Sequence, residues 1–378
     1  MTVGVIGATG YAGAELVRLL SRHPKAGNFI FSSVSFEGER MEGVYPHLLG
    51  AVSAALVKSE EVARNADVVF SALPAGVGEA FAKICVERGV PFIDLSADFR
   101  FDDDEATYAA WYGKPYAHAE LRTHSVYGLP ELNRQRVQER AGKGKLIIGN
   151  PGCYPTCATL GAFPALAKGL SGTDTIIVDA ASGVTGGGRE PSRSFHYPEC
   201  ADSIAPYKVG AHRHTPEIAR NFSEIAARNG RRAPLVVFTP HLAPMNRGIL
   251  STIYIPLPPE WRLSAGDVHA VEAVTRILPP SQEVTEKAEA IRRIYEDFYR
   301  NEPFVRVLPA GVIAATNRVR QSNYCDISVH LDHSGSTLII ASAIDNMVKG
   351  AAGQAIQNMN IIFGYDEKAG LEAVPALF

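Results

Sequence analysis

The sequence has few cysteines, and those present follow no recognisable pairing pattern. Its five cysteines are an odd number, have scattered spacings, and form no Cys-x-x-Cys pair. This scarcity argues against a disulfide framework and a structural zinc site, and it favours a reducing compartment. We therefore expect a cytoplasmic protein without a metal site, although residues 212–214 form a His-x-His stretch that a metal could use.

Long hydrophobic runs and blocks of one charge are also missing. No apolar run reaches 18 residues, so no segment is expected to span a membrane. The 37 lysines and arginines nearly balance the 40 acidic residues, without any basic block. Nucleic acid and membranes are therefore not expected partners. Because the first residues already follow a strand pattern, we expect no signal peptide.

The sequence does contain a regular alternation of strand and helix patterns over residues 1–150. Such alternation is typical of an α/β fold with a Rossmann-type, doubly wound parallel sheet. We therefore predict a dinucleotide-binding domain at 1–150. Its expected strands lie in "VGVIG", "NFIFSSVS", "ADVVFSALP", "VPFIDLSADF" and "KLIIGN".

The pattern changes in the second half, where strands are longer and fewer helices separate them. We predict an α+β catalytic and oligomerisation domain with a mixed sheet at 151–344. The two strands beside "DHSGS" should form an antiparallel hairpin, because that stretch favours a turn. A charged surface helix is expected at 281–303. A last helix at about 345–378 is expected to return to the first domain and complete it.

The turn after the first expected strand has the pattern G-x-x-G-x-x-G, formed by Gly7, Gly10 and Gly13. Glycines let the backbone approach a pyrophosphate, and the following helix start favours an anion. A tight turn without a ligand is the alternative. The second strand then leads into small hydroxyl residues such as Ser33, with Arg40 nearby, which favours NADP(H) over NAD. Glu37 could still serve as the ribose-binding acid if that strand ends later.

Cys153 lies between the strand "KLIIGN" and a helix expected to begin at Pro155. A thiolate just before a helix start is stabilised, and Gly152 leaves space for a substrate carbonyl. We interpret Cys153 as a nucleophile, against the alternative of a buried structural cysteine. Cys157, one turn further along, is expected to be a packing residue.

The stretch "KVGAHRHTPEI" offers an acid or base to such a nucleophile. We expect Thr215 to be the N-cap of a helix. His212 and His214 would then lie exposed in the turn before it, with only one of them facing Cys153. The glycines of "SGVTGGGREPSR" could pack against a nicotinamide, with Arg189 or Arg193 reaching an anion. For these arginines a surface salt bridge is an equal alternative.

Taken together, these residues resemble the N-acetyl-γ-glutamyl-phosphate reductase family of arginine biosynthesis. The resemblance implies NADPH-dependent reduction of an acyl phosphate to an aldehyde, with Cys153 as nucleophile and a histidine as acid and base. We favour His214, which lies nearer the helix start. The related aspartate-semialdehyde dehydrogenases imply an anion-binding role for Arg100. The stretches that carry the resemblance are "GATGYAGAEL", "IDLSADFR", "VYGLPEL", "GNPGCYPT", "PYKVGAHRHTPEI", "FTPHLAPMNRGIL" and "DNMVKGAAGQAIQNMN".

The full predicted site includes further positions from both halves of the chain. The expected partners are a small acyl phosphate or semialdehyde, phosphate and a second copy of the chain, as a homodimer or homotetramer. Three alternatives stay open: an aminoadipate-type reductase, an aspartate-semialdehyde dehydrogenase, and a non-catalytic NADP-binding sensor. The predicted cofactor-binding residues are Gly7, Thr9, Gly10, Tyr11, Ala12, Gly13, Ser33, Arg40, Ser71, Pro74, Ser182, Gly183, Gly186 and Asn317. The predicted substrate-binding residues are Arg100, Asn150, Arg189, Lys208 and His212.

Overall fold

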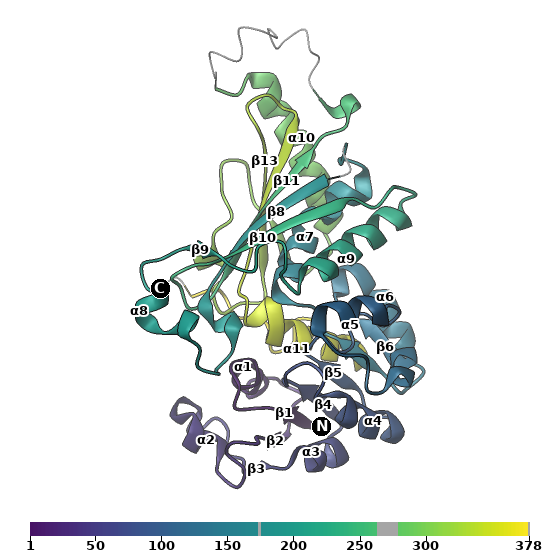
Figure 1. Cartoon of the computed structure of the whole chain (residues 1–378), viewed down its shortest axis with the longest axis vertical. Helices are drawn as coiled ribbons and strands as arrows, with labels where there is room; N and C mark the ends of the chain where they lie inside the picture. The colour runs from purple at the N-terminus through teal and green to yellow at the C-terminus, as the bar shows by residue number, and fades with distance from the viewer. Residues whose placement is uncertain (173–174, 263–278, 377–378) are drawn as a thin grey trace.

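Two seven-stranded sheets organise the protein, one built from each half of the chain. The computed structural model describes residues 1–172, 175–262 and 279–376. Figure 1 shows the first sheet at the bottom beside the N-terminus and the second sheet above it, with α11 between them. In these described ranges, no helix is both long and apolar enough to cross a membrane.

The first sheet is entirely parallel, in the order β3-β2-β1-β4-β5-β7-β6. The predicted doubly wound sheet is therefore confirmed. The sequence patterns did not reveal the short strands β3 and β6. The strands are β1 (Thr2–Ile6), β2 (Asn28–Ser32), β3 (Leu56–Val57), β4 (Val68–Ser71), β5 (Phe92–Asp94), β6 (Ser125–Tyr127) and β7 (Ile147–Gly149). The α-helices between and around them are α1 (Tyr11–Leu20), α2 (Met41–Val44), α3 (Ser59–Asn65), α4 (Glu79–Arg88), α5 (Glu105–Tyr112) and α6 (Pro130–Ala141).

The second sheet is mixed, as predicted, in the order β12-β13-β14-β11-β8-β10-β9. Its pairs β8–β10 and β12–β13 are parallel and the others are antiparallel. The predicted hairpin is confirmed as the pair β13–β14. The strands are β8 (Thr175–Ser182), β9 (Ala205–Pro206), β10 (Leu235–Leu242), β11 (Ile249–Pro256), β12 (Val305–Val307), β13 (Cys325–Leu331) and β14 (Thr337–Ile344). The helices of this half are α7 (Cys153–Lys168), α8 (Tyr197–Cys200), α9 (Thr215–Arg228) and the predicted charged helix α10 (Gln282–Tyr299).

The last helix returns to the first half of the chain. A π-helical turn at Val348–Ala352 leads into α11 (Gly353–Ile362). Side chains of α11 such as Ile356 share one buried core with Leu16 of α1. The helix ends well before residue 378, because Gly364 adopts a left-handed conformation with φ of 65° just after it. The expected helix to the end of the chain is therefore wrong, although α11 does pack against α1.

Candidate active site

Cys153 is the first residue of α7, at the point where the chain leaves β7. The helix begins two residues earlier than predicted, so Pro155 lies in its first turn, where a missing N–H costs little. On the other side, the π-helical turn approaches closely. A Cβ added to Gly350 would lie 2.7 Å from the Cβ of Cys153. The thiol is therefore held between a helix start and a glycine of the last helical segment.

Burial raises the pKa of the Cys153 thiol to about 11. The backbone N–H of Tyr154 and the charge of Arg100 oppose this effect without cancelling it. Desolvation of the charged form outweighs the stabilisation that the helix start was expected to give a thiolate. At neutral pH the resting group is a thiol, so a neighbouring base has to remove its proton.

His214 lies in the right place to be that base. It is the N-cap residue of α9, one position before the predicted cap Thr215. A Cβ added to Gly152 would lie 2.6 Å from His214 Nε2, so this nitrogen faces the residue directly before Cys153. Burial, helped by the nearby charges of His212 and Arg100, holds the pKa of His214 well below its usual value. The imidazole is therefore neutral and free to accept a proton.

His212 has a different environment, in which its side chain is only 8 % exposed. Its ring makes edge contacts with the rings of Tyr154, Tyr207 and Phe238. Its Nδ1 accepts a hydrogen bond of 3.1 Å from the backbone N–H of His214. The prediction that both histidines are exposed is wrong, because this aromatic cluster encloses His212 and His214 is itself largely buried. Its position supports a role in holding His214.

Glu217 was missed by the sequence analysis, although it lies in the quoted "HRHTPE" stretch. This fully buried residue of α9 accepts hydrogen bonds from the backbone N–H of Gly152 (2.8 Å) and from the hydroxyl of Tyr127 (2.8 Å). It also forms an ion pair of 3.1 Å with Arg100. Glu217 therefore ties the turn before Cys153 to the helix that carries His214. The useful signal was its spacing, since it falls one helical turn beyond His214.

Arg100 was predicted to bind an anion, and its side chain is buried within this network. Its Nε donates to the carbonyl of Asn150 at 2.8 Å, and its Nη2 donates to the carbonyl of Leu95 at 2.8 Å. Its Nη1 donates to Glu217. Each of its three nitrogens thus has a protein partner. The structure gives Arg100 a positioning role, and anion binding by Arg100 stays a prediction.

We predict that Glu217→Gln destabilises the protein by about 3–5 kcal/mol, because it leaves the buried charge of Arg100 unpaired. Urea unfolding followed by circular dichroism measures this. The matched control is Glu224→Gln, also in α9, which removes a carboxylate from the surface ion pairs of Glu224 with Arg136 of α6 and Arg228 of α9. This change should alter stability by less than about 1 kcal/mol. Equal effects of the two changes would contradict the role given to Glu217.

The predicted glycine turn is formed between β1 and α1. Gly7 has φ of 78°, and a Cβ added to Gly13 would lie 2.2 Å from the carbonyl oxygen of Gly7. Only glycine fits either position. Gly10 is the N-cap of α1, and Ser33 directly follows β2, with its hydroxyl 2.7 Å from that of Thr9. This arrangement could hold a dinucleotide pyrophosphate at the helix start.

Other predicted cofactor residues come from both halves. Ser182 ends β8, and Gly183 follows it. A Cβ added to Gly186 would lie 3.7 Å from Ser182 Oγ, so the predicted glycine loop folds back on this strand end. Ser71 ends β4 and is fully buried, with Pro74 shortly after it.

Three predicted residues lie outside these clusters or have other partners. Arg40 forms an ion pair of 2.7 Å with Glu42, and Asn317 is exposed on a short turn. Lys208 lies near the histidines, since its charge lowers the pKa of both. Another predicted substrate residue, Asn150, donates to the carbonyl of Ala351 at 3.1 Å, which places it beside the π-helical turn.

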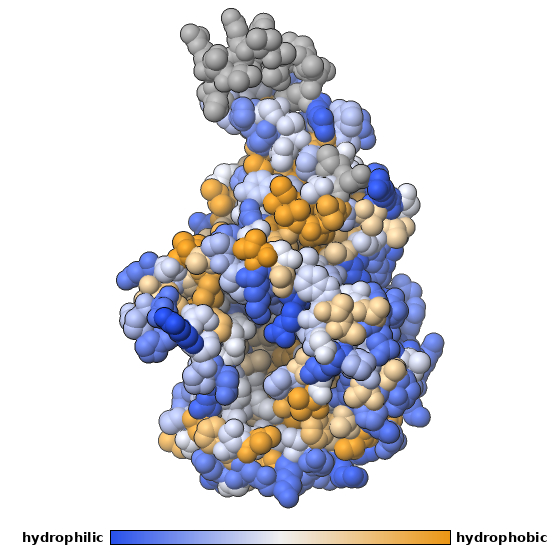
Figure 2. All heavy atoms as spheres, in the orientation of Figure 1, coloured by the Kyte–Doolittle hydropathy of each residue, from blue (hydrophilic) through white to orange (hydrophobic). Residues whose placement is uncertain are grey.

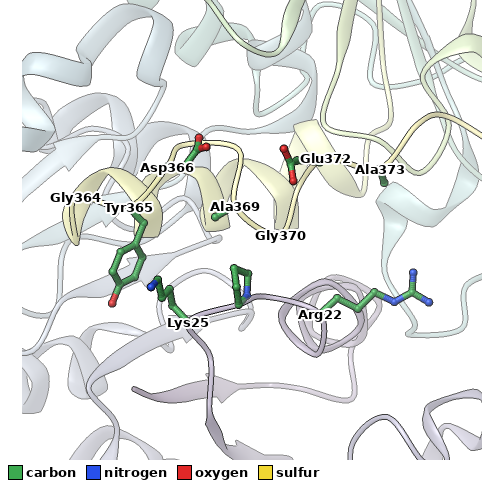
Figure 3. Close-up of a pocket in the computed structure, with 10 residues that line it drawn as sticks. Arg22, Lys25, Gly364, Tyr365, Asp366, Ala369, Gly370, Glu372 and Ala373 are labelled. Carbon is green, nitrogen blue, oxygen red and sulfur yellow. The ribbon is translucent and has the colours of Figure 1, made fainter.

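A hollow of about 830 Å³ lies elsewhere, between the end of α1 and the chain after α11. Figure 3 shows basic Arg22 and Lys25 on one side of it and acidic Asp366 and Glu372 on the other. No predicted site residue lines this hollow. In the described part of the chain, no group of three or more His, Cys, Asp or Glu residues could hold a metal ion.

Two family models match the sequence. The model described as "Semialdehyde dehydrogenase, NAD binding domain" matches residues 2–140, and "Semialdehyde dehydrogenase, dimerisation domain" matches 153–277 and 273–346. The N-acetyl-gamma-glutamyl-phosphate reductase of Clostridium kluyveri is 45% identical over 376 residues, covering 100% of this chain and 99% of its own. The enzyme of the same name from Brachyspira hyodysenteriae is 44% identical over 378 residues, with the same two coverages.

Solved structures of lower identity share the fold. Aspartate semialdehyde dehydrogenase II from Vibrio cholerae, complexed with ASA, has a TM-score of 0.68 at 15% identity, covering 96% of this chain and 98% of its own. Aspartate semialdehyde dehydrogenase with NADP from Candida albicans has a TM-score of 0.64 at 18% identity, with 98% of each chain covered. The Rossmann-type sheet and the mixed second sheet therefore occur together in both proteins.

Proposed function

Because the chain belongs to the N-acetyl-γ-glutamyl-phosphate reductase family, we propose that it reduces N-acetyl-γ-glutamyl phosphate with NADPH to N-acetyl-glutamate 5-semialdehyde and phosphate. One observation carries the chemistry. Cys153 begins α7, and the Nε2 of a neutral His214 faces the residue before it. A cofactor-binding sensor would need neither group, so their pairing supports an enzyme.

In the proposed mechanism, His214 first accepts the proton of the Cys153 thiol. The sulfur attacks the acyl carbon, and the bond to the phosphate oxygen breaks, which leaves a thioester on Cys153. NADPH, when bound, supplies the hydride that reduces this thioester carbon. As the resulting thiohemiacetal anion collapses, the C–S bond breaks, the aldehyde leaves, and His214 returns its proton to the sulfur of Cys153. The expelled phosphate takes up the proton that balances the reaction.

The turn before Cys153 supports these steps without reacting. Glu217 holds the N–H of Gly152, and Arg100 holds the carbonyl of Asn150. These bonds fix the direction in which the chain enters α7. A nucleophile held this way keeps one geometry while its charge changes, which lowers the cost of reaching the transition state.

The test is the reverse reaction, in which N-acetyl-glutamate 5-semialdehyde and phosphate should reduce NADP. We expect the rate to require phosphate. The homologous semialdehyde that is one methylene longer should react about 10–200-fold less well, the usual discrimination for one methylene. A faster rate with the longer aldehyde would indicate the aminoadipate-type reductase. No phosphate-dependent reduction with either aldehyde would contradict the proposal.

We also propose that the protein works as a homodimer or homotetramer in the cytoplasm. On the outward face of the second sheet, Ile177, Leu235 and Val237 are 42%, 63% and 43% exposed. Figure 2 shows apolar atoms gathered over the part of the molecule where Figure 1 places β8 and β10. A partner subunit could cover this face. The five unpaired cysteines fit a reducing compartment.

For the organisation of the chain, we propose an NADP-binding unit at 1–150, completed by the segment 345–378, and a catalytic and oligomerisation unit at 151–344. The shared core of α1 and α11 supports this division. The thiol then lies at the junction, because α7 begins directly after the last strand of the first sheet.

A further inference from the structure

Arg189 belongs to the loop after β8 in the second half of the chain, yet its side chain reaches the glycine turn of the first. Its Nη1 donates to the carbonyl of Thr9 at 3.0 Å and lies 3.3 Å from the hydroxyl of Tyr45. The same guanidinium lies 5.2 Å from the ring centre of Phe36 and 5.1 Å from that of Tyr45. This position differs from the predicted substrate-binding role, because it places Arg189 at the turn between β1 and α1.

The residues around Arg189 lie where Rossmann-type proteins bind the adenosine ribose of the cofactor. The ribose is recognised just beyond the second strand, where an acidic residue binds the 2′-hydroxyl of NAD and a cationic residue binds the 2′-phosphate of NADP. Here β2 ends at Ser32, and Ser33 follows it with its hydroxyl against Thr9. Glu37 is exposed four residues further along the chain. The residues at the strand end itself, Ser32 and Ser33, therefore present hydroxyl groups.

Arg40, the cation that the sequence suggested for this role, has other partners. Its Nε donates to Glu42 at 2.7 Å, and its Nη2 donates to the hydroxyl of Ser53. Ser53 and Arg40 together lower the pKa of Glu42 to about 2, so this carboxylate stays charged and pairs with Arg40. By contrast, no carboxylate among the described residues lies within ion-pair distance of Arg189.

We propose that Arg189 binds the 2′-phosphate of NADP(H), together with the hydroxyl groups of Ser33 and Thr9. The proposal rests on the proposed function for the identity of the cofactor. A guanidinium can offer two parallel N–H groups to a phosphate, and its own charge is not offset by a protein carboxylate. Cofactor choice would then depend on a residue from the catalytic half, so NADP(H) would join the two halves at its adenosine end.

The test compares binding of NADP and NAD by fluorescence titration, without any acyl substrate. Wild type should bind NADP at least tenfold more tightly than NAD, which corresponds to about 1.4 kcal/mol. Arg189→Gln should weaken NADP binding at least tenfold and change NAD binding less than twofold. The matched control Arg40→Gln should keep the wild-type preference. Competition by 2′,5′-ADP and 5′-AMP isolates the adenosine end, and only 2′,5′-ADP should lose affinity in Arg189→Gln.

Several results would overturn the proposal. Equal loss of NADP and NAD would show that Arg189 contacts a part common to both cofactors. Loss of the preference in Arg40→Gln alone would return the role to Arg40. If wild type bound NADP and NAD with equal affinity, the protein would not recognise the 2′-phosphate at all. Since none of these measurements uses the acyl substrate, a failed reductase assay with intact NADP binding would count against the proposed function alone.

Discussion

Replacing Cys153 with serine should remove nearly all turnover, a loss of about 10³-fold or more in kcat, while NADP binding stays within twofold of wild type. A serine hydroxyl at this position is a much weaker nucleophile than a thiol, because it is far less acidic and forms little of the attacking anion. Neither the glycine turn nor the groups proposed to bind the 2′-phosphate include Cys153, so the affinity for NADP should not change. Steady-state kinetics and fluorescence titration measure the two quantities separately.

Cys157→Ser is the matched control, since Cys157 lies one helical turn further along α7. Its thiol is fully buried and donates to the carbonyl of Ser342 at 3.2 Å, a bond that a serine can also make. This variant should keep most of its activity. Iodoacetamide should inactivate wild type by modifying Cys153, whereas labelling of the partly accessible Cys200 should leave activity unchanged. Comparable losses of kcat in Cys153→Ser and Cys157→Ser would rule out the assignment of Cys153.

Replacing His214 with asparagine should lower kcat by about 10²–10⁴-fold, the range expected for loss of a general acid and base. The raised pKa of Cys153 explains the upper end of this range of kcat loss. A thiol with a pKa of about 11 is ionised in only about one molecule in 10⁴ at pH 7 when no base assists it. Asparagine keeps a similar size and a polar group, so the change tests proton transfer more than packing.

The pH profile gives an independent measure of the same role. His214 acts as a base only when neutral, and its pKa is lowered, so wild-type kcat/KM should fall only when the pH drops well below 6.5. In His214→Asn this acid limb should disappear, and the remaining rate should rise with pH toward about 11 as Cys153 ionises by itself. If the acid limb persists unchanged in His214→Asn, it reports the titration of another group.

His212→Asn is the control for His214→Asn. His212 lies two residues away and supports the backbone N–H of His214, so its loss should lower kcat much less. A larger kcat loss in a folded His212→Asn protein would mean that His212 is the acid and base. If neither change lowers kcat, the proposed mechanism is wrong at the proton-transfer step.

Local sequence was sufficient where the chemistry depends on neighbours along the chain. The glycine spacing of Gly7, Gly10 and Gly13 predicted the turn between β1 and α1, because a close backbone approach there admits no side chain. The strand before Cys153 and the helix after it were predicted for the same reason, although the helix start was misplaced by two residues. The strands β3 and β6 were not predicted; β3 has only two residues, too few to show a period.

Only the tertiary structure decided how charged and titratable groups behave. The thiol of Cys153 has a raised pKa because burial removes water from it, and no sequence pattern near a helix start reports that burial. Glu217 approaches Gly152, and Arg189 reaches Thr9, across separations of 65 and 180 residues. The sequence by itself predicted the fold class, and it singled out Cys153 and the histidine stretch as candidate catalytic groups, because these predictions depend on local pattern. The partners of Arg40, Arg100 and Arg189 depended on which distant segments the two sheets bring together, and a long, flexible arginine side chain can reach any of several such neighbours.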